Sequence, residues 1–265
     1  MKIAGFTDIG LRRTHNEDHI GFNQNLGIAV LADGMGGHQA GEVAAEMAVQ
    51  LVLESLQALI SKENSVPITS SQILKFVSNT ISDSNTKIFQ ASEAQEERKG
   101  MGTTVVAAVV RGSHFYAGHV GDSRLYLVRD EHLKRITRDH SLVQDLIDKG
   151  FYTEREARNA QVGHVVTRAL GTRAEVEVDT IHHDLKVNDV LLLCSDGLSD
   201  MVQDWLIEET INEHSGDLQF TARKLIKLAN RHGGKDNISV ILMHVQSVDV
   251  KSGCVAAEIE GQQAQ

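Results

Sequence analysis

The sequence is poor in the residues that usually divide or cross-link a chain. It has one proline, Pro67, and two cysteines, Cys194 and Cys254, among 265 residues. Cys194 lies inside an apolar run and Cys254 near the C-terminus, so neither a disulfide framework nor a cysteine-based zinc site is indicated. Because no proline-rich or low-complexity linker is present, we expect one domain over residues 1–246, followed by a disordered tail over 247–265.

Basic residues are also in deficit. The chain has 26 Lys and Arg against 36 Asp and Glu, which gives a net charge of −10 at pH 7. A nucleic-acid or anionic-membrane surface would need the opposite sign, so we expect neither partner. No apolar run reaches membrane-spanning length and the N-terminus has no signal-peptide core, so we expect a cytoplasmic protein, and a monomer. The acidity itself fits either a hard-metal site or simple solubility.

The hydrophobic residues, 41% of the chain, are sufficient for a sizeable core, and their spacing predicts strands and helices. Strands are expected at 2–8, 18–23, 27–33, 103–110, 113–120, 124–130, 132–137, 189–196 and 237–245. Helices are expected at 40–60, from a cap at Ser70 or Ser71 onward, at 205–214 and at 218–231, with a weakly helical segment at 141–162 and extended segments at 164–171 and 175–181. Short turns make consecutive strands antiparallel, which predicts an α+β architecture of antiparallel sheets covered by helices.

The stretch LADGMGGHQAGEVAAEMA at 31–48 joins a predicted strand to a predicted helix through a glycine-rich turn. Gly36 and Gly41 have the spacing of a phosphate-binding loop, but Glu42 stands where a lysine is required, and its carboxylate would repel a phosphate. A dinucleotide-binding turn would need glycine instead of Gln39. Both nucleotide-binding interpretations are therefore disfavoured.

A repeated Asp-Gly pattern is more informative. AVLADG at 29–34 and LLLCSDG at 191–197 each end an apolar strand with an aspartate, and NED (16–18), GDS (121–123) and KDN (235–237) add acids at strand edges. A carboxylate at the tip of a buried strand needs a partner. No lysine-rich segment could pair with these acids, so divalent cations are the simplest neutralising partners, and oxygen ligands favour magnesium or manganese over zinc.

Eight stretches complete the pattern: RTHNED, LADGMGGHQAGEVAA, GMGTT, GDSRLY, TRDHS, TRALG, SDGLSD and KDNISV. In this order they resemble the motifs of the metal-dependent protein phosphatases, type 2C, bacterial branch. The resemblance extends from about residue 6 to residue 245, nearly the whole chain. It implies a four-layer α-β-β-α sandwich, in which two central antiparallel sheets are flanked by helix pairs.

The resemblance also implies a core site for two ions, Mn²⁺ or Mg²⁺. Asp33 would bridge the two ions, and the backbone carbonyl of Gly34 would hold one of them. Asp196 and Asp236 would ligate the first ion.

Five further residues acquire roles from the same resemblance. Glu17 and Asp18 would support the core site, partly through bound water, and Asp122 would help to hold a third, weaker ion. Arg13 would grip the substrate phosphate with its planar, two-pronged guanidinium. The proton for the leaving serine or threonine oxygen would come either from His38 or from a metal-bound water, and the sequence leaves this choice open.

These residues predict a protein serine/threonine phosphatase in which a water that bridges the two ions attacks phosphorus in line. The substrates would be phosphoserine and phosphothreonine proteins, and the family implies a bacterial serine/threonine kinase as the opposing enzyme. Two alternatives remain: a non-catalytic phosphoprotein-binding signalling module on the same fold, and a regulator that dephosphorylates one antagonist in a sigma-factor pathway. His140 of TRDHS is expected to be structural, and residues 141–162 correspond to the family's variable flap.

Overall fold

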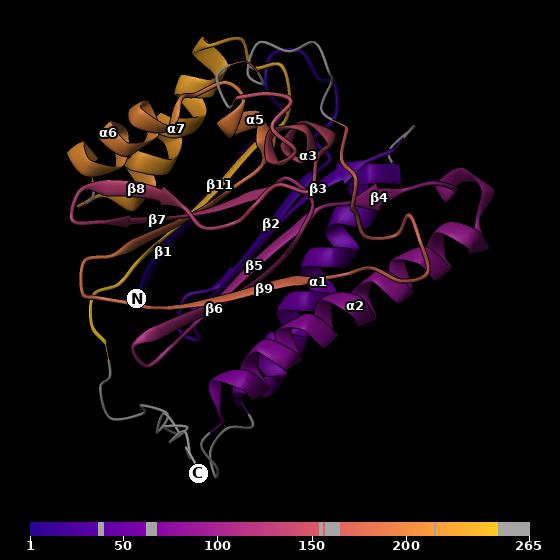
Figure 1. Cartoon of the computed structure of the whole chain (residues 1–265), viewed down its shortest axis with the longest axis horizontal. Helices are drawn as coiled ribbons and strands as arrows, with labels where there is room; N and C mark the ends of the chain where they lie inside the picture. Colours follow the sequence, from indigo (N-terminus) through magenta and orange to yellow (C-terminus); the bar gives the residue numbers. More distant parts are fainter. Residues whose placement is uncertain (37–39, 62–67, 154–155, 157–164, 215, 249–265) are drawn as a thin grey trace, which may run out of the picture.

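The computed structural model describes the chain except for residues 37–39, 62–67, 154–155, 157–164, 215 and 249–265. Two antiparallel sheets stack at the centre, and pairs of helices cover their outer faces (Figure 1). The predicted α+β sandwich of four layers is therefore confirmed. The expected tail lies, apart from residues 247–248, outside the described residues, and the single domain over 1–246 stays a prediction.

The first sheet has five strands in the order β1-β11-β10-β7-β8. Their bounds are β1 Lys2–Asp8, β11 Ile238–His244, β10 Val190–Cys194, β7 Arg124–Arg129 and β8 His132–Arg135. The second sheet follows the order β2-β3-β5-β6-β9, with β4 paired to β3. Its bounds are β2 Asp18–Asn23, β3 Ile28–Met35, β5 Val105–Arg111, β6 His114–Val120, β9 Asp179–Asp184 and β4 Gly102–Thr103.

Helices α1 (Ala40–Ser61) and α2 (Ser70–Ala94) cover the second sheet, and α6 (Asp204–His214) and α7 (Leu218–Arg231) cover the first. The short helices are η1 (Glu96–Arg98), α3 (Leu142–Asp148) and α5 (Asp196–Ser199). Among the described residues, α1 is long and apolar enough to span a membrane by length and composition alone. Its apolar face is buried against the second sheet, as in the core helix of a layered fold.

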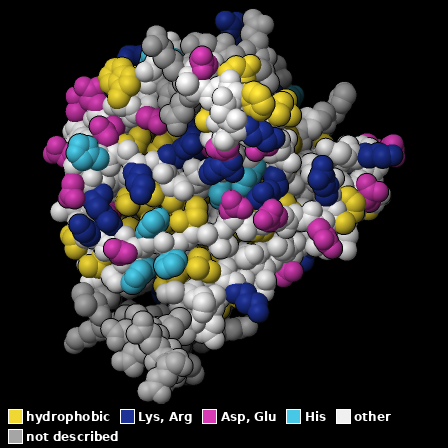
Figure 2. Space-filling model, in the orientation of Figure 1, with side chains coloured by type: hydrophobic (Ala, Val, Ile, Leu, Met, Phe, Trp, Pro, Cys, Tyr) yellow, Lys and Arg dark blue, Asp and Glu magenta, His cyan; other side chains and the backbone are white. Residues whose placement is uncertain are grey.

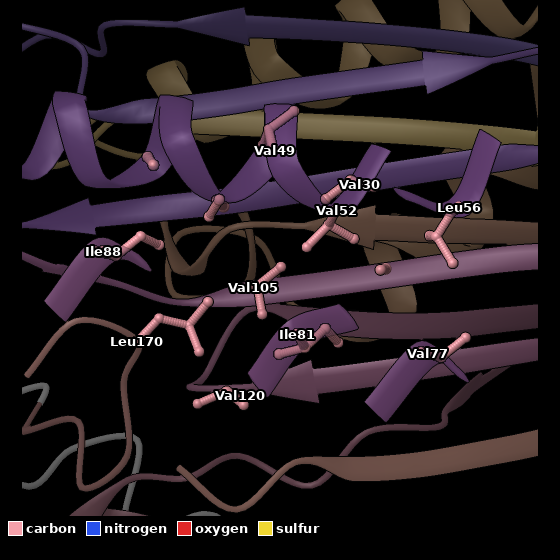
Figure 3. Close-up of a cluster of buried hydrophobic side chains, with 14 of the residues drawn as sticks. Val30, Val49, Val52, Leu56, Val77, Ile81, Ile88, Val105, Val120 and Leu170 are labelled. Atoms are coloured by element: carbon pink, nitrogen blue, oxygen red, sulfur yellow. The ribbon is translucent and has the colours of Figure 1, made fainter. Parts of the chain in front are cut away.

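Strand β3 shows why the sandwich has three apolar layers. Side chains alternate between the two faces of a strand, so a strand buried on both faces is apolar throughout. Ile28, Val30 and Ala32 belong to the core under α1 and α2, whereas Ala29 and Leu31 belong to the core between the sheets. Strand β10 divides in the same way between the inter-sheet core and the core under α6 and α7. Figure 3 shows the first of these cores, with Val49, Val52, Leu56, Val77, Ile81 and Ile88 of the two helices over Val30, Val105 and Val120.

Several predicted boundaries were wrong. The cap of α2 is Thr69, not Ser70 or Ser71, because Thr69 forms a capping box with Gln72. The segment expected to be extended over 175–181 enters a strand only at residue 179, where β9 begins and pairs with β6 as far as residue 184. The segment expected to be extended over 164–171 forms isolated bridges at Val166 and Leu170.

The segment expected to be weakly helical over 141–162 contains α3 at 142–148, and much of its remainder lies outside the described residues. The face drawn in Figure 2 carries Lys, Arg, Asp and Glu side chains close together, with histidines near its middle. Charges of both signs are therefore interspersed on this face rather than segregated.

Candidate active site

Five aspartates converge at one end of the two central sheets. Asp18 begins β2 and lies directly opposite Asp33 of β3. Asp196 begins α5 just after β10, Asp236 lies just before β11, and Asp122 lies just after β6. Because neighbouring strands are antiparallel, the end of one strand lies beside the start of the next. These positions therefore meet at the same end of the sheets.

The close approach of these carboxyl groups raises the pKa values of Asp33 and Asp196. Burial raises the pKa of Asp33 well above its usual value, and the charges of Asp18 and Asp196 raise it further. Burial also raises the pKa of Asp196, with further increases from Asp122 and Asp236. Like charges and low solvent access both disfavour ionised carboxylates, so the cluster requires compensating positive charge at neutral pH.

Two carboxylate oxygens of the cluster have no hydrogen-bond partner in the part of the chain that the structure describes. Among the described residues, Asp18 Oδ1 and Asp196 Oδ1 are buried without a hydrogen bond. The other oxygen of Asp18 accepts a hydrogen bond of 2.8 Å from Ser195 Oγ. A buried carboxylate oxygen is costly unless it is bonded to a donor or a cation. Because the potential metal-ligand atoms that converge here are all oxygens, the residues present fit a hard divalent cation such as Mn²⁺ or Mg²⁺.

The GMGTT stretch holds the backbone of Asp33. Thr104 Oγ1 accepts a hydrogen bond of 3.0 Å from the Asp33 amide, and the Thr104 amide donates to the Asp33 carbonyl at 2.9 Å. Thr103 Oγ1 donates to the same carbonyl at 2.9 Å. Both polar backbone groups of Asp33 are thus fixed by two consecutive threonines, which leaves its carboxylate to face the cluster.

Gly34 is required by close packing. A Cβ atom at this position would lie 2.2 Å from the carbonyl oxygen of Gly41 and 2.7 Å from that of Glu17. The Gly34 amide donates to the Glu17 carbonyl at 3.1 Å, and the Glu17 carboxylate lies against Gly41 at the start of α1. Burial raises the pKa of Glu17. The structure therefore brings Glu17 and Gly34 to the same edge as the aspartates.

Asn237 lies in the KDNISV stretch, but no role was predicted for it from the sequence. Its side-chain oxygen accepts from the Glu17 amide at 2.8 Å, and its amide group donates to the carbonyls of Ile9 and His15, each at 2.9 Å. It therefore fastens the loop that carries Arg13 to the start of β11. The only indication in the sequence was its position beside Asp236.

Arg13 lies at the edge of the cluster. Its guanidinium donates to Asp236 Oδ2 at 2.6 Å, and half of its side chain is exposed. The bond to Asp236 raises the pKa of Arg13. His38, the other predicted catalytic residue, lies outside the described residues.

Asp122 occupies the side of the cluster next to Asp196. Burial raises the pKa of Asp122 to about 6, and the charge of Asp139 contributes to the rise. Asp122 in turn raises the pKa of Asp196, whereas Asp18 is the first neighbour to act on Asp33. The charge of Asp122 also raises the pKa of Asp33, so Asp122 belongs to the same group of interacting carboxyls.

Comparison with known proteins identifies the same family as the sequence motifs. The family model described as Protein phosphatase 2C matches residues 12–225. The serine/threonine phosphatase stp of Listeria monocytogenes is 41% identical over 240 residues, which cover 89% of this chain and 93% of that protein.

Two solved structures are similar over almost the whole chain. The Mycobacterium tuberculosis serine/threonine phosphatase PstP/Ppp has a TM-score of 0.82 and 36% identity, covering 93% of this chain and 99% of that chain. The catalytic domain of PstP in complex with two manganese ions has a TM-score of 0.80 and 36% identity. The match covers 93% of this chain and 98% of that chain.

The raised pKa of Asp18 predicts how stability depends on pH without divalent cations. Burial raises this pKa from 3.8 to about 6 in the folded chain. Because the folded state then binds more protons than the unfolded state between these values, ionisation of Asp18 costs stability as the pH rises through this window. In EDTA, Asp18→Asn should therefore be increasingly more stable than the unmodified chain from pH 4 to pH 7, as measured by urea denaturation.

Saturating Mn²⁺ should remove or reverse this difference, because the cation favours the ionised carboxylate. A difference in EDTA that shrinks as the pH rises would contradict the burial of an uncompensated Asp18.

Proposed function

This chain belongs to the protein phosphatase 2C family, and we propose that it hydrolyses phosphoserine and phosphothreonine in proteins with two divalent cations, Mn²⁺ or Mg²⁺. The predicted family is confirmed, and the chain is a phosphoprotein phosphatase rather than a non-catalytic module. The observation that carries the proposal is the convergence of the buried aspartates, with oxygens of Asp18 and Asp196 left without a protein partner among the described residues.

The ions would be held by the residues of this cluster. Asp33 occupies its centre, and the charges of its neighbours all act on it, which supports a bridging role. The further ligands that we propose are Glu17, Asp18, Gly34, Asp196 and Asp236, with Asp122 on a third, weaker ion. When bound, such ions lower the pKa of a water molecule and offset negative charge on the phosphoryl oxygens.

Arg13 would orient the phosphate. Its planar guanidinium can hold two phosphate oxygens at once, and its half-exposed position at the edge of the cluster leaves it accessible to a substrate. The bond to Asp236 aims the guanidinium at the cluster, and Asn237 fastens the loop from which it projects. Arg13 thus binds and orients, and it transfers no proton.

Protonation of the leaving oxygen is assigned to His38, with a bound water as the alternative. His38 follows the end of β3 by three residues, close in sequence to Asp33. We further propose that a bacterial serine/threonine kinase supplies the phosphoproteins, and that the chain acts as a cytoplasmic monomer.

The function is tested by hydrolysis of p-nitrophenyl phosphate and of a phosphothreonine peptide with Mn²⁺, with and without EDTA. Replacement of an outer partner of a metal ligand costs about 10- to 100-fold. Because Asp33 would be a metal ligand itself, its loss should cost more than the loss of an outer partner. We therefore expect Asp33→Asn to lower kcat/KM by more than ~100-fold. Asp83→Asn, on the exposed face of α2, is the matched control and should retain full activity. Turnover that persists in EDTA, or in Asp33→Asn, would refute the proposal.

The role of Arg13 is tested by Arg13→Ala, with the exposed neighbour Arg12→Ala as control. Loss of a charged hydrogen bond to the phosphate should raise KM for the phosphopeptide about tenfold or more. The Mn²⁺ affinity, measured by calorimetry, should change much less. If Arg13→Ala weakens Mn²⁺ binding more than it raises KM, Arg13 serves the ligand Asp236 rather than the substrate.

A further inference from the structure

A second group of titratable side chains lies beside the turn that carries Asp122. The potential ligand atoms of His119, His140 and Asp179 lie within 4.8 Å of one another. The two imidazole rings are stacked with their centroids 4.6 Å apart, and both histidines are buried. Such a group could bind a metal or could serve as a hydrogen-bonded support, and the bonds on each nitrogen decide between the two.

The hydrogen bonds fix the tautomer of His140. The Gly121 amide donates to His140 Nδ1 at 3.0 Å, so Nδ1 carries no hydrogen. The hydrogen of the neutral ring is therefore on Nε2, which lies 3.3 Å from Asp179 Oδ2. Arg168 Nη1 lies 3.1 Å from the same nitrogen, but it is itself a donor and donates to Asp179 Oδ1 at 2.7 Å. Burial lowers the pKa of His140, in agreement with a neutral ring.

His119 has the same tautomer. Its Nε2 lies 3.0 Å from the Arg138 carbonyl, which only accepts hydrogen bonds, so this nitrogen also carries its hydrogen. With Nδ1 of His140 bonded to an amide and Nε2 protonated, His140 has no lone pair for a cation. His119 Nδ1 has no hydrogen-bond partner among the described residues, but this single nitrogen and Asp179 leave the three-residue group without its third ligand. The group is therefore a hydrogen-bonded support.

His140 holds both polar backbone groups of Gly121. In addition to accepting from the Gly121 amide, it donates its own amide to the Gly121 carbonyl at 2.9 Å. Gly121 has φ of +107°, and a Cβ there would lie 2.6 Å from Thr104 Cβ, so the turn is packed tightly on Thr104. Asp122 is the next residue, and its direction follows from the conformation of this turn.

The following residues attach the same turn to the centre of the cluster. Ser123 Oγ and Thr104 Oγ1 form a hydrogen bond of 2.7 Å, and Thr104 Oγ1 also accepts from the Asp33 amide. Arg124 donates to both carboxylate oxygens of Asp139, at 3.0 and 2.6 Å. The GDSR and TRDHS stretches are thus joined at two adjacent points, Gly121–His140 and Arg124–Asp139.

We infer that His140 is a positioning residue: held as the Nε2–H tautomer by Asp179, it accepts the Gly121 amide and thereby aims the Asp122 carboxylate at the cation beside Asp196. This inference rests on the proposed function, because it concerns the third, weaker cation. Partners outside the ligand shell orient metal ligands in this way and affect affinity strongly.

Two substitutions test the roles of the two ring nitrogens of His140 one at a time. In His140→Asn, the side-chain oxygen can take the place of Nδ1 and accept from Gly121, but it does not reach Asp179. In His140→Gln, the longer side chain can reach Asp179 but offers no acceptor at the Nδ1 position. Asp122→Asn serves as the reference that removes the cation ligand itself.

Mn²⁺ titration calorimetry of the whole chain measures the weakest site in each variant. His140→Gln should weaken this site about tenfold or more, and His140→Asn should keep it within about threefold, as expected for an outer partner that is lost or retained. Amide exchange provides a readout independent of the metal. The Gly121 amide should be protected in the unmodified chain and in His140→Asn, and exposed in His140→Gln.

The outcomes distinguish this inference from the proposed function. If Asp122→Asn loses the weakest site while His140→Gln keeps both that site and the protection of Gly121, the positioning role is overturned and the function stands. If Asp122→Asn binds Mn²⁺ as the unmodified chain does, Asp122 is no ligand and both its cation and the inference are overturned. Nitrogen-15 NMR of the unmodified chain tests the tautomer without any substitution: a hydrogen on His140 Nδ1 would also overturn the inference.

Discussion

The architecture depends on keeping several buried carboxyl groups together at one edge of two sheets. Burial and mutual repulsion raise the pKa of Asp33 and Asp196, so the ionised cluster is unfavourable without added positive charge. Arg13 contributes a single positive charge, at the exposed margin of the cluster. Divalent cations at the centre would turn this unfavourable arrangement into a stable one, which links folding stability and catalysis to the same ions.

The rest of the fold supplies the rigidity that such a site requires. Apolar layers on both faces hold β3 and β10 in the sandwich, with Asp33 two residues before the end of β3 and Asp196 two residues after the end of β10. Hydrogen bonds from Thr103, Thr104 and Asn237 then hold the backbone on which the carboxylates stand. Metal sites are selective when their ligands are held by such outer partners, because less reorganisation is needed on binding.

The sequence predicts the apolar layers and the acidic edge well, because strand alternation and Asp-Gly tips are local patterns. It fails where a role depends on residues far apart in the chain, as for Asn237, which bonds to residues 9, 15 and 17. The Glu-Val alternation at 175–178 resembles a strand, and Val176 and Val178 do pack on the core under α2. In the described part of the chain no strand pairs with residues 175–178. The alternation therefore indicates burial of one side of the segment and does not establish a sheet.

The central claim is that cations occupy the aspartate cluster. Anomalous scattering from crystals grown with saturating Mn²⁺ tests it most directly, because it locates each ion and the side chains that touch it. The account predicts two strong peaks beside Asp33, in contact with Asp196 and Asp236. A cluster that shows no anomalous peak under these conditions would contradict it.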